Sequence, residues 1–195
     1  TEELDSLSIQ TAALQIAEEP EYSLLAARLL ARFMREEVHR QGLYSFSECM
    51  QRCYDLGLLH DGALEFVQAH EQVLNDALET SRDRNFHYFG LRTVYDRYLL
   101  KHPETRRVVE TPQVFFMRVA CGLAADVDEA IELYNLFSNF DYLPSSPTLF
   151  NSATRHPQLS SCFLVDSPAD DLEGIYDRYK EVARLSKFGG GIGIA

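Results

Sequence analysis

The residues best suited to chemistry lie in the last third of the chain, between Tyr142 and Ala195. There Cys162 follows Ser160 and Ser161, and a cluster of glycines comes later. Glycine leaves backbone amides open to anionic oxygens, and a hydroxyl can orient a ribose or a phosphate. A cysteine among such groups suggests redox or radical chemistry. The alternative is that Cys162 is a small core residue in a strand beside a serine-rich loop.

The glycine run 189–193 does not have the pattern of the common nucleotide-binding loops. A dinucleotide fingerprint follows a strand and opens a helix, whereas this run follows an expected helix. A Walker A loop needs Gly-Lys-Ser/Thr, which the sequence lacks. We expect the glycines to stop a helix and lead into a strand at 192–195, whatever else the loop does.

The elements around Cys162 can be read from local signals. Residues 143–148 contain two prolines, so we expect no regular helix there. Residues 160–165 predict a short, largely buried strand. Asp170, with Glu173 three residues later, has the spacing of a capping box. The helix that follows should end near Lys187 and carries apolar residues on one face, namely Leu172, Ile175, Tyr176, Tyr179, Val182, Ala183 and Leu185.

The upstream chain predicts helices that would position this segment. Their expected ranges are 1–17, 21–40, 61–80, 88–101, 112–124 and 126–138, with a further helix after Ser45. Ser45 with Glu48, and Asp126 with Glu129, have capping-box spacing. Aromatic residues are dense in the middle of the chain, and we expect core packing from them; they are Phe86, Tyr88, Phe89, Tyr95, Tyr98, Phe115 and Phe116.

Composition limits the classes of function. The 195 residues carry a net charge of −12, which argues against a nucleic-acid partner. No apolar run of membrane-spanning length and no signal peptide is visible, and four cysteines without a CxxC motif favour the cytoplasm. Cys49 and Cys53 would share a helix face. No further cysteine or histidine completes a zinc site with them, so we expect no metal site.

Three separate blocks carry a resemblance to a known family. They are LPSSPTLFNS at 143–152, QLSSCFL at 158–164 and GGIG at 190–193. Their order and spacing resemble the large, catalytic subunit of class I ribonucleotide reductase. HYFGLRT at 87–93 and the segment after Thr111 also resemble its helical domain.

The resemblance implies a mainly α fold for this chain. A helical N-terminal domain would lead into the first elements of a ten-stranded α/β barrel. The implied division is a remnant of a regulatory ATP-cone at 1–17, the helical domain at 18–141 and the start of the catalytic barrel at 142–195.

The resemblance also implies roles for six residues. Cys162 would be the catalytic thiol that reduces the substrate as half of a redox pair. Substrate-binding residues would be Ser146, Ser161, Cys162 and Gly191. Asp170 and Lys187 would bind an allosteric effector, ATP or a deoxynucleoside triphosphate, at a dimer interface. A helix N-cap and a cation at a helix C-terminus are the alternatives for this last pair.

The implied activity replaces the ribose 2′-OH of nucleoside diphosphates with hydrogen. The implied partners are a second large subunit, a small subunit that supplies a radical from its metal, and thioredoxin or glutaredoxin as reductant. No cofactor is expected on this chain itself. The motifs for the radical cysteine, its glutamate and its asparagine do not occur before Ala195, so we expect the 195 residues alone to be inactive. The alternatives are a cobalamin-dependent ribonucleotide reductase and a non-catalytic helical module that senses nucleotides or binds proteins.

Overall fold

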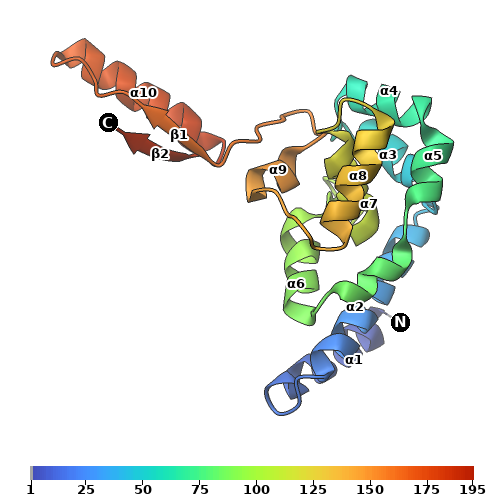
Figure 1. Cartoon of the computed structure of the whole chain (residues 1–195). Coiled ribbons are helices and arrows are strands. Elements are labelled where there is room, and N and C mark those ends of the chain that lie inside the picture. The colour runs from blue at the N-terminus through green and yellow to red at the C-terminus, as the bar shows by residue number, and fades with distance from the viewer. Residues whose placement is uncertain (1) are drawn as a thin grey trace.

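The computed structural model describes residues 2–195, and most of them form helices packed into one body (Figure 1). In chain order the helical elements are α1 (Glu2–Leu14), η1 (Gln15–Ala17), α2 (Tyr22–His39), α3 (Phe46–Asp55), α4 (Asp61–Ala69), α5 (Glu71–Ala77), η2 (Thr80–Asn85), α6 (Tyr88–Thr93), η3 (Val94–Tyr98), α7 (Pro112–Cys121), α8 (Val127–Ser138), α9 (Ser146–Asn151) and α10 (Leu172–Lys187). The strands are β1 (Cys162–Val165) and β2 (Gly191–Ile194). The predicted mainly helical fold is confirmed.

Local capping sets several helix starts. The capping box of α3 is confirmed, because Ser45 accepts from the Glu48 amide and Glu48 accepts from the Ser45 amide. At α8, Asp126 accepts from the Glu129 amide as predicted. The Glu129 carboxylate, however, accepts from the amide of Ala125, one residue before the cap. The bonds to the side chains of Ser45 and Asp126 satisfy backbone donors that the first helical turn leaves open.

Two long predicted helices are interrupted. The predicted helix at 61–80 is split into α4 and α5 at His70, whose backbone leaves the helical region. The predicted helix at 88–101 changes at Val94 into the π-helix η3 and ends at Tyr98. The apolar spacing continues through both interruptions, so periodicity alone did not reveal them.

The expectation of no helix at 143–148 is wrong in part, because α9 begins at Ser146. Pro147 lies in its first turn, where a missing N–H costs no hydrogen bond. The helix lasts only six residues.

The helix α7 is the centre of the body. All of its residues are buried, and it contacts α3, α4, α8, α9, η2 and η3. Its buried polar side chains are paired: Gln113 donates to Asp83 at 2.9 Å and accepts from Tyr134 at 2.9 Å. A helix buried on every face must satisfy such groups within the protein.

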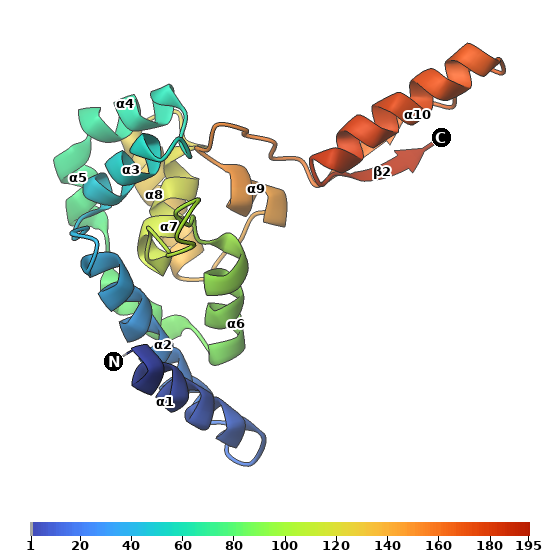
Figure 2. The same ribbon diagram turned by 180° about the vertical axis from the view of Figure 1, so that it is seen from behind.

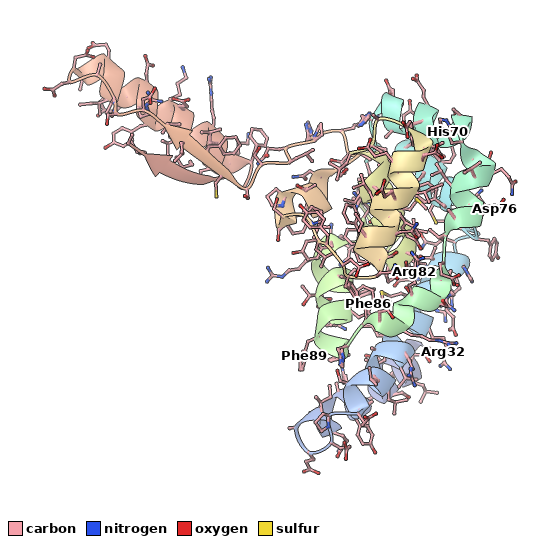
Figure 3. The ribbon with its side chains drawn as sticks, viewed as in Figure 1. Arg32, His70, Asp76, Arg82, Phe86 and Phe89 are labelled. Carbon is pink, nitrogen blue, oxygen red and sulfur yellow. The ribbon has the colours of Figure 1, made fainter. Side chains whose placement is uncertain are left out.

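The predicted aromatic core is confirmed for Phe86, Phe115 and Phe116, which are 5%, 1% and 2% exposed. Phe89 corrects this prediction, because 68% of it is exposed. Figure 3 labels both Phe86, toward the middle of the body, and Phe89, at its outer edge. The two residues are close in sequence, but Phe86 precedes the turn into α6 and is buried, whereas Phe89 lies on α6 and is exposed.

The strands β1 and β2 form a parallel pair joined by α10, and this unit projects from the helical body in both views (Figures 1 and 2). The register pairs Cys162 with Gly191 and Val165 with Ile194. The predicted strand is confirmed, but its predicted burial is wrong, since Val165 alone in β1 is buried. Parallel sheets are normally covered on both faces, and here little of the described chain covers this one. No helix within residues 2–195 is long and apolar enough to cross a membrane.

The close approach of α7 to the segment after α9 gives a stability prediction. A Cβ added at Gly122 would overlap Ser152 Oγ and the backbone nitrogen of Ala153. We expect Gly122→Ala to lower the free energy of unfolding by about 1–3 kcal/mol, because backbone must move. Urea unfolding of the 195-residue chain measures it.

The matched control is Gly62→Ala in α4, where the new Cβ would meet the His60 ring at an ordinary 3.5 Å. This variant should be stabilised by about 0.5–1 kcal/mol, because alanine favours the helix. Equal effects of the two substitutions would contradict the close contact at Gly122.

Candidate active-site segment

The strand pair brings three of the predicted site residues together. Cys162 on β1 lies opposite Gly191 on β2, and the Gly191 amide donates to the carbonyl oxygen of Ser161 at 2.8 Å. A Cβ at Gly191 would lie 3.5 Å from the Cys162 sulfur. Ser161, Cys162 and Gly191 are all exposed, so a ligand could reach the thiol and the backbone beside it.

The loop before β2 has the conformation that only glycine adopts easily. Gly189 ends α10 with φ +81°, as the predicted helix stop requires. A Cβ at Gly190 would lie 2.6 Å from the Phe163 ring, so this glycine lets the loop pack against β1. The glycines therefore allow β2 to lie beside Cys162.

Ser146 lies apart from this trio, at the start of α9. Its hydroxyl is 2.9 Å from the hydroxyl of Tyr98 at the end of η3. Two hydrogen bonds connect α9 to the loop that enters β1: Thr148 donates to the Leu159 carbonyl at 3.0 Å and Asn151 to the Gln158 carbonyl at 2.8 Å. The structure thus links Ser146 to the cysteine segment through the loop, without direct contact.

A buried ion pair fixes α9 on the body. Arg118 and Glu110 are both fully buried, with Nε and Oε2 2.9 Å apart. The same guanidinium donates to the carbonyl oxygens of Ser152 at 2.7 Å and Leu149 at 3.5 Å. Arginine can do this because its five N–H donors form a fixed fork.

The two predicted effector residues lie at opposite ends of α10. The prediction that Asp170 caps this helix is wrong, because Asp171 accepts from the Gly174 amide at 2.7 Å. Adjacent aspartates have nearly the same capping spacing, so the sequence could not choose between them. Lys187 is the last residue of the helix, as predicted, about 24 Å along the axis from its start. Asp170 and Lys187 of one chain therefore do not meet.

The thiols differ sharply in environment. Cys162 is exposed, whereas Cys49, Cys53 and Cys121 are buried in helices. Burial raises the pKa of Cys49 and of Cys121 to about 12, and raises that of Cys53 well above its ordinary value. The thiolate is the reactive form, so we expect these three thiols to react slowly at neutral pH. Of the cysteines, Cys162 alone has the access that chemistry requires.

Within residues 2–195, no group of three or more histidine, cysteine, aspartate or glutamate side chains gathers at a spacing that could hold a metal ion. The arrangement offers a thiol, hydroxyls and backbone amides.

Sequence reasoning missed Tyr98, Glu110 and Arg118. Tyr98 belongs to the aromatic residues that the sequence predicts to pack in the core, and nothing in its spacing indicates the contact with Ser146. Glu110 and Arg118 are eight residues apart and straddle the start of α7. The charge of Arg118 within the mostly apolar helix 112–121 was the available signal, because buried charges need partners.

Comparison with known proteins matches two family models to this chain. The model described as ribonucleotide reductase, all-alpha domain, matches residues 84–157. The model described as ribonucleotide reductase, barrel domain, matches residues 160–195. Together these ranges cover more than half of the chain.

Whole-chain relatives agree with the models. The chain is 40% identical over 205 residues to the ribonucleoside-diphosphate reductase large subunit of Danio rerio, covering 100% of this chain and 25% of that protein. It is 40% identical over 204 residues to the large chain of Schizosaccharomyces pombe, and 38% over 205 residues to the large subunit of Vaccinia virus. These alignments cover all of this chain and 24% and 26% of those proteins. The chain thus spans about a quarter of the length of these curated relatives.

The difference between the thiols predicts selective labelling. In the native chain at pH 8, we expect one cysteine to react quickly with a thiol reagent and the other three to react only after unfolding. Mass spectrometry should place the fast label on Cys162, and Cys162→Ser should abolish it. Cys121→Ser is the control, which should keep the fast phase. Fast labelling of a second cysteine would contradict the burial described above.

Proposed function

The chain belongs to the family of ribonucleotide reductase large subunits, and we propose that it is the part of a ribonucleoside-diphosphate reductase that contributes one reducing thiol and part of the substrate site. The observation that carries this proposal is the exposed Cys162 on β1, paired with Gly191 and next to Ser161. The names of the relatives, which specify ribonucleoside diphosphates, support this substrate class.

The proposed chemistry is a two-electron reduction. Cys162 and a second cysteine of the large subunit, which is not among these 195 residues, give up two electrons and two protons. The ribose 2′-OH leaves as water, a hydrogen takes its place, and the two thiols become a disulfide. Exchange with thioredoxin or glutaredoxin restores both thiols. A radical from a metal-containing small subunit initiates the reaction.

Substrate binding is assigned to Ser146, Ser161 and Gly191. Hydroxyls and an open backbone suit the oxygens of a nucleoside diphosphate. The exposure of all three residues supports this assignment. Ser146 lies on α9, so the proposed site would be bounded by the helical body on one side and by the strand pair on the other.

Effector binding is assigned to Asp170 and Lys187, with two copies of the large subunit forming the site. The apolar residues Leu172, Tyr176 and Tyr179 of α10 are 64%, 65% and 63% exposed, which leaves that face open for a partner. An antiparallel pair of α10 helices would bring Asp170 of one copy near Lys187 of the other. The aspartate would accept from effector hydroxyls and the lysine would meet its phosphates.

The domain division remains part of the proposal. Residues 1–17 would belong to a regulatory ATP-cone, 18–141 to the helical domain and 142–195 to a ten-stranded barrel. The exposed faces of β1 and β2 support a barrel start, because further strands and helices would cover them. We also propose a cytoplasmic location, which four free thiols support.

The test uses the full-length protein with its small subunit and a thioredoxin system, and follows conversion of CDP to dCDP. We expect Cys162→Ser to lower turnover on the order of 10³-fold or more while substrate still binds, because the other thiol cannot form the disulfide alone. The 195-residue chain by itself should show no turnover.

Cys121→Ser is the matched control, since it makes the same change at a buried thiol of α7. It should retain near wild-type turnover. Wild-type turnover in Cys162→Ser would show that Cys162 is not a reducing thiol. Absence of turnover in the wild-type assembly would favour a module without chemistry of its own.

A further inference from the structure

We propose that Tyr98 is a positioning residue that orients the hydroxyl of Ser146 toward the substrate. The inference rests on the proposed function, in which Ser146 binds the nucleoside diphosphate. The direct observation is the distance of 2.9 Å between the Tyr98 and Ser146 hydroxyl oxygens. This is hydrogen-bonding distance for two hydroxyl groups.

The ring of Tyr98 is held in place by aromatic packing. It stacks on Phe150 with ring centroids 4.5 Å apart and planes 11° apart. Its other neighbour is the buried Phe115 of α7, at 6.1 Å. Since Phe150 and Ser146 both belong to α9, the tyrosine contacts this helix through its ring and its hydroxyl at once.

The backbone that carries Tyr98 departs from the predicted α-helix. The last turn, η3, is a π-helix, and the Leu99 amide closes it by donating to the Val94 carbonyl at 3.1 Å. A π-turn contains one more residue than an α-helical turn, so it changes the direction of the side chains that follow. Such turns are rare and occur frequently at functional sites. Here the turn ends on the residue that contacts Ser146.

Both sides of the contact are fixed by one buried carboxylate. Glu110 accepts from the amide of Leu100, two residues after Tyr98, at 2.7 Å. Glu110 also pairs with Arg118, which holds the carbonyl oxygens of Leu149 and Ser152 on the α9 side. The same ion pair therefore holds the segments that bring Tyr98 and Ser146 together.

The chemistry of hydroxyls indicates which of the two side chains donates its proton to the other. A hydroxyl has one proton to donate and two lone pairs that can accept. The phosphate oxygens of a nucleoside diphosphate only accept hydrogen bonds, so Ser146 would have to donate its proton to bind one of them. Tyr98 would then donate its own proton to Ser146 Oγ. This leaves the serine proton for the substrate and restricts the rotation of the hydroxyl.

Steady-state kinetics of the full-length enzyme with its small subunit test the inference. We expect Tyr98→Phe to raise the KM for CDP about 3- to 10-fold, the value of one hydrogen bond, with kcat changed less than about 2-fold. Its melting temperature should match the wild type, since phenylalanine keeps the ring stacking. Ser146→Ala should also raise the KM, and the double variant should be no worse than Ser146→Ala alone.

The matched control is Tyr95→Phe, which makes the same change in the same π-turn. Tyr95 donates to Glu37 of α2 at 3.1 Å, whereas Tyr98 bonds to Ser146 of α9. Its KM should stay at the wild-type value.

The outcomes separate the inference from the proposed function. A raised KM in Ser146→Ala with a wild-type KM in Tyr98→Phe, or additive effects of the two changes, would overturn the positioning role alone. A wild-type KM in Ser146→Ala would overturn the substrate-binding assignment and the positioning role with it.

Discussion

The buried ion pair between Glu110 and Arg118 is the interaction on which the arrangement of this chain depends. Neither side chain reaches solvent, and two buried charges are tolerated only when paired and hydrogen-bonded. Here further donors and acceptors of the pair bond to the backbone of Leu100, Leu149 and Ser152. The need to pair these buried charges thereby ties two distant segments to α7, the residues after η3 and the end of α9. Close packing of Gly122 against Ser152 and Ala153 reinforces the same junction.

This junction determines where the chemistry-bearing residues lie. The helical body holds α9 and Ser146, and hydrogen bonds from Thr148 and Asn151 hold the loop that leads to β1. Beyond that loop, the strand pair aligns Cys162 with Gly191 by backbone pairing. The proposed substrate site thus has two kinds of support, a short helix held against the buried α7 and a parallel strand pair. Its thiol is exposed, while the buried cysteines of the body are protected by a raised pKa.

Sequence reasoning succeeded at several positions where the determinants are local, although at the start of α10 it chose Asp170 instead of the adjacent Asp171. The caps at Ser45 and Asp126, the end of α10 at Lys187 and the glycine stop after it depend on neighbours within a few residues. It failed where distant contacts decide. The break at His70, the π-turn ending at Tyr98 and the partners of Arg118 could not be read from spacing. The exposure of β1 also differs from the prediction. An apolar strand pattern indicates that the strand is buried, but it does not say which part of the protein covers it.

Hydrogen exchange in an Arg118→Lys variant tests the central claim most directly. Lysine keeps the charge beside Glu110 but lacks the fork that reaches the carbonyl oxygens of Leu149 and Ser152. The account predicts faster amide exchange at Ser152, Thr154 and Arg155, with the amides of α2 unchanged. Unchanged protection at 152–155, or a uniform loss throughout the helical body, would contradict the role of this ion pair in holding α9.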